Sequence, residues 1–149
     1  MSDSLKLRIQ EDVKAAMRAQ EKERLGTIRL LMAAIKQREV DERIVLDDTQ
    51  IVAVLDKMIK QRRDSISQFS AAGRQDLADK ESREIEVLQS YMPQALSESE
   101  LTALIEAAIS ESGATSIKDL GKVMGILKPQ VQGRADMSVV STELKKRLA

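Results

Sequence analysis

The residues between Leu120 and Asp136 combine positive charge with a helix face that lacks side chains. Gly121 and Gly125 stand four positions apart inside an apolar pattern of helical spacing, so on a helix they share one face. Each glycine costs roughly 1 kcal/mol relative to alanine in a helix interior, so a pair of them needs a packing or contact reason. We therefore expect another molecule or another helix to approach this face closely.

Basic residues accompany the bare face, and a third glycine follows it at Gly133. The bases are Lys118, Lys122, Lys128 and Arg134. Residues 117–149 carry seven bases and three acids, a net charge of +4, whereas residues 94–116 carry four acids and no base. Positive charge beside a bare surface suits the phosphates of RNA. Since no aromatic side chain is present here for base stacking, we expect contacts to phosphate, sugar and shape.

A structural interpretation of the same pattern stays open. Gly121 and Gly125 could instead let short helices pack tightly, with the bases serving only to keep the surface soluble. Further along, Lys128-Pro129 disfavours helix at Lys128, and the residues from Gly133 to Asp136 predict a turn that ends in an N-cap.

The composition argues against catalysis. The chain has no cysteine and no histidine, which removes thiolate nucleophiles and the commonest base and metal ligand at neutral pH. Carboxylates at Glu81, Glu84 and Glu86 are interleaved with bases and lack a metal-binding pattern. A basic group around Arg62 has acids at helical spacing and is expected to be a solvated face. We expect no catalytic residue, metal or cofactor.

The fold is predicted to be all-α. Of the 149 residues 42% are hydrophobic, yet there is one Phe, one Tyr and no Trp, so the core is aliphatic and strands are disfavoured. Helical periodicity predicts a four-helix bundle-like domain over residues 1–93 and a small three-helix tail domain over residues 94–149. The boundary is placed at Pro93, ahead of a capping-box sequence that begins at Ser97.

Helix caps follow from the same pattern. We expect Asp47 or Asp48 to cap the third helix, Gly73 to close it, Ser116 to cap the glycine-bearing helix, and Asp136 to cap the last one.

Location and partners follow from charge and hydropathy. No apolar segment follows Met1 and no apolar run approaches the roughly 18 residues of a membrane span, so we expect a cytoplasmic protein without a membrane partner. The formal charge of zero gives no overall bias toward nucleic acid, and we expect no DNA partner.

Several motifs together resemble the YqeY-type proteins of the GatB/YqeY family. The motifs are Arg29-Leu30-Leu31-Met32-Ala33-Ala34-Ile35-Lys36, Gly73-Arg74-Gln75-Asp76-Leu77-Ala78, Tyr91-Met92-Pro93-Gln94, Gly121-Lys122-Val123-Met124-Gly125 and Gly133-Arg134-Ala135-Asp136. The second half is similar to the tail of the B subunit of glutamine-dependent tRNA amidotransferase, a helical appendage that helps to bind tRNA. The resemblance implies a carbon–nitrogen ligase label with glutamine as amido donor, without the catalytic cradle that performs the reaction.

Three functions follow, in order of preference. The first is a non-catalytic module that binds structured RNA, with tRNA expected, alongside a tRNA-charging or amidotransferase complex. The second is a protein-interaction adaptor in which the face of Gly121 and Gly125 receives a partner's helix. The third, an amidotransferase acting alone, is disfavoured.

Overall fold

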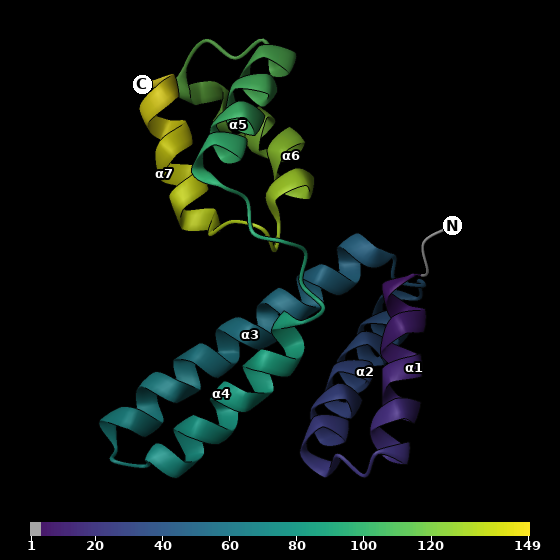
Figure 1. Ribbon diagram of the computed structural model, residues 1–149. Coiled ribbons are helices and arrows are strands. Elements are labelled where there is room, and N and C mark those ends of the chain that lie inside the picture. The colour runs from purple at the N-terminus through teal and green to yellow at the C-terminus, as the bar shows by residue number, and fades with distance from the viewer. Residues whose placement is uncertain (1–3) are drawn as a thin grey trace. The chain divides into compact units, whose positions relative to one another are not determined.

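The computed structural model describes residues 4–149, which contain seven α-helices and no strand (Figure 1). The all-α prediction is confirmed. The helices are α1 (Leu5–Arg18), α2 (Lys22–Glu42), α3 (Asp48–Ala71), α4 (Gln75–Gln89), α5 (Glu98–Ser112), α6 (Leu120–Val131) and α7 (Met137–Leu148), with a 3-10 turn, η1 (Ile117–Asp119), before α6. They form two compact units, one up to Met92 and one from Pro93.

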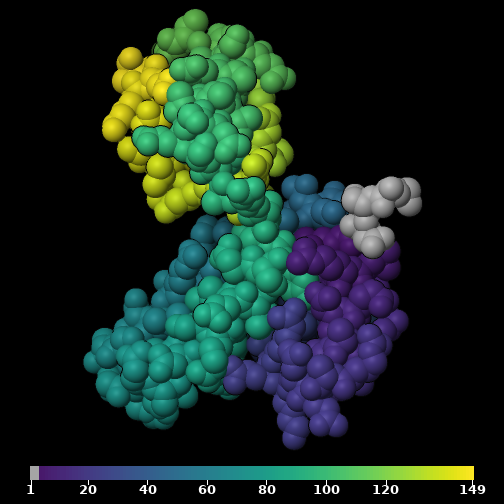
Figure 2. Space-filling view, viewed as in Figure 1, coloured from purple at the N-terminus to yellow at the C-terminus, as the bar shows by residue number. Residues whose placement is uncertain are grey.

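The first unit consists of two helical hairpins, α1–α2 and α3–α4. Figure 2 shows them in contact, with the far end of the α3–α4 hairpin standing clear of α1 and α2. All four helices contribute to one aliphatic core, in which Ile9, Ile28, Leu55 and Leu88 are almost completely buried. The part of α3 in this core ends at Ile59, which agrees with the free far end of the hairpin.

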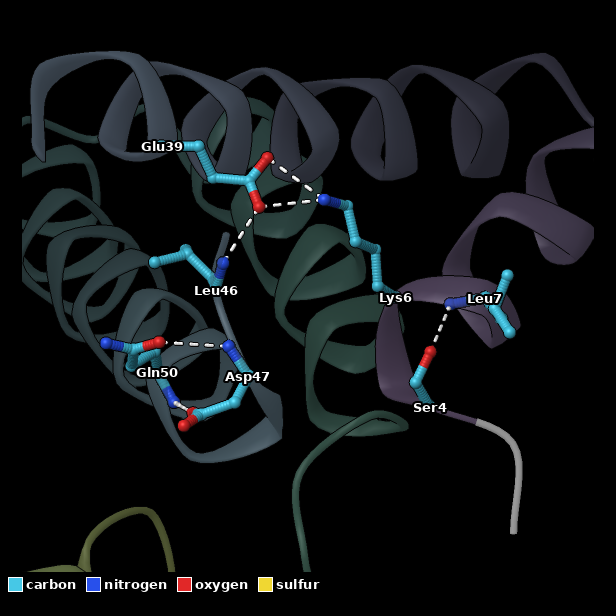
Figure 3. Close-up of polar contacts among 7 residues, drawn as sticks. All are labelled: Ser4, Lys6, Leu7, Glu39, Leu46, Asp47 and Gln50. Carbon is cyan, nitrogen blue, oxygen red and sulfur yellow. Dashed lines mark hydrogen bonds and ion pairs between the residues drawn. The ribbon is translucent and has the colours of Figure 1, made fainter. Parts of the chain in front are cut away.

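Local sequence explains where these helices begin and end. The Ser4 hydroxyl accepts a hydrogen bond from the Leu7 N–H (3.2 Å) ahead of α1. Asp47 forms a capping box with Gln50, each side chain accepting from the other residue's N–H at 2.9 Å (Figure 3). Gly73 follows α3 with a φ of +75°, a conformation that glycine adopts without strain. The capping role of Asp47 and the closing role of Gly73 are therefore confirmed.

Glu39 links α2 to both α1 and the connection that leads into α3. Its carboxylate accepts hydrogen bonds from the Lys6 ammonium (2.7 and 3.0 Å) and the Leu46 N–H (2.9 Å), as Figure 3 shows. The Lys6 hydrogen bond, followed by the Leu46 N–H, holds the pKa of Glu39 below its ordinary value.

Tyr91 ties the end of α4 to α1. Its buried hydroxyl donates a hydrogen bond to the Asp12 carboxylate (2.6 Å), and the Arg8 guanidinium lies 4.9 Å from the ring centroid. Arg8 also donates to the Ser90 carbonyl (2.9 Å). Burial and then the hydrogen bond to Asp12 raise the pKa of Tyr91. The last residues of the first unit are thus fixed to its first helix.

The second unit has its own aliphatic core, contributed by α5, α6 and α7. Ile105, Val123, Leu127, Val140 and Leu144 are fully buried in it. The predicted capping box opens α5, where the Ser97 hydroxyl accepts from the Glu100 N–H, and Asp136 caps α7 by accepting from the Ser138 N–H.

Two predicted details of the glycine-bearing helix are wrong. The Ser116 side chain makes no cap hydrogen bond, and the 3-10 turn precedes the α-helix. The helix also continues through Pro129 to Val131. Val131 is completely buried, so core packing favours the extra turn. Pro129 has no N–H to donate to the Gly125 carbonyl, but Gly125 is exposed, so water can donate to this carbonyl instead.

Candidate nucleic-acid interface

Helix α6 turns its glycines and lysines away from the core of the second unit. Val123, Leu127 and Val131 recur every fourth residue and are completely buried. Gly121, Lys122, Gly125 and Lys128, which are all exposed, occupy the opposite side of the helix. We call these four residues, with the exposed Lys118 of η1, the α6 outer face.

The glycines of this face are open to solvent. A Cβ atom built on Gly121 or Gly125 would have no heavy atom within 4 Å outside the local helix backbone. Neither glycine has a positive φ. Tight packing among the short helices of the second unit therefore does not explain these glycines.

The lysines of the α6 outer face have no acidic partner. None of Lys118, Lys122 and Lys128 takes part in an ion pair or side-chain hydrogen bond with any residue between positions 4 and 149. α6 is also the one α-helix of the described chain that contains neither Asp nor Glu. Three exposed positive charges thus lie along this surface without an ion pair, and the nearby Asp119 carboxylate accepts from the Thr115 N–H instead.

Gly133 and Arg134 lie in the predicted turn between α6 and α7, which ends in the Asp136 N-cap. Gly133 has a φ of +76° in the turn after α6. The Arg134 guanidinium donates from Nε to the Gln94 carbonyl (3.0 Å), and the Arg134 carbonyl accepts from the Leu96 N–H (2.8 Å). Arg134 therefore fastens residues 94–96 to the α6–α7 turn, and part of its hydrogen-bonding capacity is already used.

The positive charge of Arg134 also acts on Glu100 in the first turn of α5. The pKa of Glu100 is lowered first by the backbone N–H and then by the side chain of Ser97, with a further contribution from Arg134. Ser97 and Glu100 therefore cap α5, and the Arg134 charge favours the ionised form of the Glu100 carboxylate.

The end of α7 contains two bases without an ion pair and one base that forms ion pairs. Lys145 and Lys146 are exposed and have no ion pair within the part of the chain that the structure describes. Arg147 pairs with Glu106 (3.1 Å) and Glu143 (3.6 Å). The net positive charge of residues 117–149 is thus carried mostly by unpaired lysines.

The carboxylates of α4 form a structural ion pair. The Arg62 Nε lies 2.9 Å from the Glu84 carboxylate and 3.8 Å from that of Glu81, and Arg62 also donates to the Met58 carbonyl (3.3 Å). Arg62 and Glu84 are largely buried, so the expectation of a solvated face at Arg62 is wrong. Within residues 4–149 no group of three or more acidic side chains is placed to hold a metal ion.

Comparison with known proteins identifies the family. A family model described as "Yqey-like protein" matches residues 6–148. The chain belongs to the YqeY-like family. A YqeY-like relative from Pyrenophora tritici-repentis is 34% identical over 143 residues, which cover 93% of this chain and 77% of the relative. A relative from Kluyveromyces lactis is 34% identical over 142 residues, covering 92% and 72%.

Both relatives are named "Altered inheritance of mitochondria protein 41, mitochondrial". This name contradicts the cytoplasmic location expected from the sequence, so that expectation is corrected. It rested on the absence of an apolar segment near Met1, which bears only on secretion and membrane insertion. No helix between residues 4 and 149 combines the length and apolar character needed to cross a membrane.

Proposed function

We propose that this YqeY-like protein is a non-catalytic module that binds structured RNA through the α6 outer face, and that tRNA is its RNA. The observation that carries the proposal is that α6, which contains no acid, exposes two open glycines beside the unpaired Lys122 and Lys128, with the unpaired Lys118 just before it in η1. Lysines contact phosphate without reading sequence, and the glycines leave room for the RNA backbone to approach.

The proposal limits the kind of contact. The two aromatic residues, Phe69 and Tyr91, both precede the second unit, so no base can stack on an aromatic side chain there and recognition depends mainly on backbone and shape. Lys145 and Lys146 add further unpaired positive charge to the second unit, at the end of α7. Residence in a tRNA-charging or amidotransferase complex forms part of the proposal, because shape-directed binding alone selects weakly among RNAs.

The test is a titration of the full chain against total tRNA by fluorescence anisotropy at several salt concentrations. The variant Lys118→Ala/Lys122→Ala/Lys128→Ala should bind more weakly and lower the salt slope by about 2 to 3, since each phosphate contact adds close to one unit. Arg134 is left intact because it fastens the turn after α6.

A matched control removes three exposed bases from the first unit that also lack ion pairs among the described residues. These are Lys57, Arg63 and Lys80. The control variant should keep its affinity and salt slope. Equal losses of tRNA affinity in both variants would mean that binding is general electrostatic attraction, and this result would overturn the proposal.

A second candidate function is an adaptor in which the open glycines receive a partner's helix. The same space around Gly121 and Gly125 supports it. The variant Gly121→Ala/Gly125→Ala would then abolish capture of a protein partner, whereas loss of tRNA binding without loss of any protein partner would count against the adaptor.

A further inference from the structure

Helix α2 presents apolar side chains on two opposite faces. Ile28, Leu31 and Ile35 point into the core of the first unit and are at most 3% exposed. On the other side, Leu30 is 51% exposed and Val40 is 63% exposed. A surface helix of a globular protein normally carries one apolar face, so the second face of α2 needs its own explanation.

A line of exposed residues on this side of α2, all small or apolar except Gln37, follows the spacing of a helix–helix contact. Gly26, Leu30, Ala33, Gln37 and Val40 are separated alternately by four and three residues and are all exposed. This alternation places them in one line along the helix, as in the contact seam between paired helices. Half of the large exposed hydrophobic side chains in residues 4–149 fall within residues 30–45. We call these five positions the α2 outer stripe.

A row of bases runs beside the α2 outer stripe at intervals of seven residues. It consists of Lys22, Arg29, Lys36 and Arg43, all exposed. None of the four forms an ion pair within the described chain, and the Arg29 guanidinium contacts only the Met17 sulfur (3.9 Å). The row therefore offers uncompensated positive charge along the whole stripe.

Most other charged side chains of α2 have an ionic partner, except Asp41, which accepts only from the Gln37 amide (2.9 Å). Glu23 pairs with Arg83 (2.6 Å), Arg24 lies 3.9 Å from Glu21, and Arg38 pairs with Glu42. The carboxylate of Glu39 is occupied by Lys6 and the Leu46 N–H, leaving only a weaker attraction to Lys36. The bases of α2 without an ion pair therefore all belong to the row that borders the α2 outer stripe.

A groove of about 400 Å³ between α1 and α2 adjoins the stripe. Ile9, Met32 and Ile35 line it with apolar surface, Ala33 belongs to both the groove and the stripe, and Lys36 stands on its lining. The groove offers a place where an apolar side chain from a bound molecule can be buried.

We propose that the α2 outer stripe is a docking site for an acidic amphipathic helix of another protein. The alternating spacing and the groove match the apolar face of such a helix, and the basic row matches acids on its flank. A helix is favoured over a membrane surface because α2 contains no aromatic anchor and the stripe has small side chains where a partner backbone can come close. This site belongs to the first unit and is separate from the α6 outer face.

The test uses the full chain and a synthetic helical peptide of about 21 residues, with a Leu/Ala stripe repeating every third or fourth position and Glu on both flanks. A peptide with Lys in place of each Glu is the charge control. Binding is followed by fluorescence anisotropy, and the acidic peptide should bind at least about tenfold more tightly than the basic one.

Two sets of variants locate the site. Leu30→Glu/Val40→Glu should weaken binding of the acidic peptide by about tenfold or more, because it places like charge in the centre of the contact. Arg29→Gln/Lys36→Gln should weaken binding and reduce its salt dependence. Val139→Glu on α7 is the matched control, since Val139 is 55% exposed and lies in the second unit; it should bind as the unaltered chain does.

Three outcomes would overturn the proposal. The first is equal affinity for both peptides, or no effect of either stripe variant. The second is binding to vesicles of phosphatidylcholine and phosphatidylserine that Leu30→Glu/Val40→Glu abolishes, without peptide binding, which would make the stripe a membrane surface. The third is a dimer, detected by analytical ultracentrifugation, that the same variant dissociates, which would make the occupant a second copy of the chain.

Discussion

The glycines of the second unit differ in what their backbone requires. Gly121 and Gly125 lie in α6 with ordinary helical geometry and open space around the missing side chain, whereas Gly113 and Gly133 have φ values of +69° and +76°. Alanine could adopt the backbone conformation of the first pair, so any need for glycine there arises from something outside the second unit. The second pair is required by the local backbone.

Alanine substitutions separate these two demands. Gly121→Ala and Gly125→Ala should each raise the free energy of unfolding by about 0.5–1 kcal/mol, because alanine favours the helix and meets no neighbour. Gly113→Ala should lower it by about 1–2 kcal/mol, because a side chain is strained at positive φ. Urea denaturation followed by circular dichroism measures all three. Destabilisation by Gly121→Ala would mean that the chain itself uses the glycine.

The Glu39 carboxylate makes part of the stability depend on pH. Its pKa in the folded chain lies below the usual value of 4.5, because the Lys6 ammonium and the Leu46 N–H bond to the ionised form. The stabilisation is therefore complete above about pH 4.5 and is lost as the pH falls through the lowered pKa. Glu39→Gln should be less stable than the unaltered chain at pH 7, and the difference should shrink below pH 4.5.

Urea titrations at a series of pH values would check this expectation. Lys6→Met removes the main cause of the lowered pKa and should show the same trend. A stability difference between the unaltered chain and Glu39→Gln that stays constant down to pH 3 would contradict the assignment.

The residue types at the candidate interface could be predicted from the sequence, but their pairing could not. Lys118, Lys122 and Lys128 were predicted on local pattern, and their exposure follows from the same helical period that buries Val123 and Leu127. Arg134 reaches a carbonyl 40 positions away. Local spacing carries no information about such a contact, because it depends on how the helices pack.

At the scale of elements, the α3–α4 hairpin depends on a buried charge. Arg62 on α3 and Glu84 on α4 pair at 2.9 Å, with side chains only 14% and 11% exposed. This pair could not be predicted from helical spacing, because its members are 22 positions apart and ion pairs within one helix join residues three or four positions apart. Similarly, α6 continued past Pro129 because burial of Val131 outweighed the local preference.

Removing one partner of this pair should be more costly than removing both. Arg62→Met leaves the Glu84 carboxylate buried without its cation and should lower the free energy of unfolding by about 2–4 kcal/mol. The double variant Arg62→Met/Glu84→Leu should recover most of that loss, since two apolar side chains can pack together. Chemical denaturation of the single and double variants measures both values. Additive losses would show that the two residues act independently.

For the whole molecule, two separate aliphatic cores suggest two separate folding events. The core of the first unit and the core of the second share no residue. We propose that the two domains predicted from the sequence, residues 1–93 and 94–149, fold independently of each other. The all-α class follows from composition and periodicity alone, whereas the 3-10 turn before α6 had no clear local signal.

Expressing the two fragments separately tests the proposal. The fragment of residues 1–93 should keep the helical content expected for α1 to α4 and melt cooperatively. The fragment of residues 94–149 should also fold, with a lower melting temperature because a core of this size is marginal. Circular dichroism against temperature measures both. A fragment that is unfolded alone but recovers helix on mixing with the other would contradict independent folding.

The connection between the units is short because each end is fastened to its own unit. Tyr91 is held by Asp12 and Arg8 on one side, and Gln94 is held by Arg134 on the other, so only Met92 and Pro93 lie between them. For the two binding events proposed above, a tether this short would make the second event intramolecular, with an effective concentration in the millimolar range. A complex offering both an acidic helix and an RNA would therefore gain avidity from this chain, and lengthening the tether with glycine and serine would reduce it.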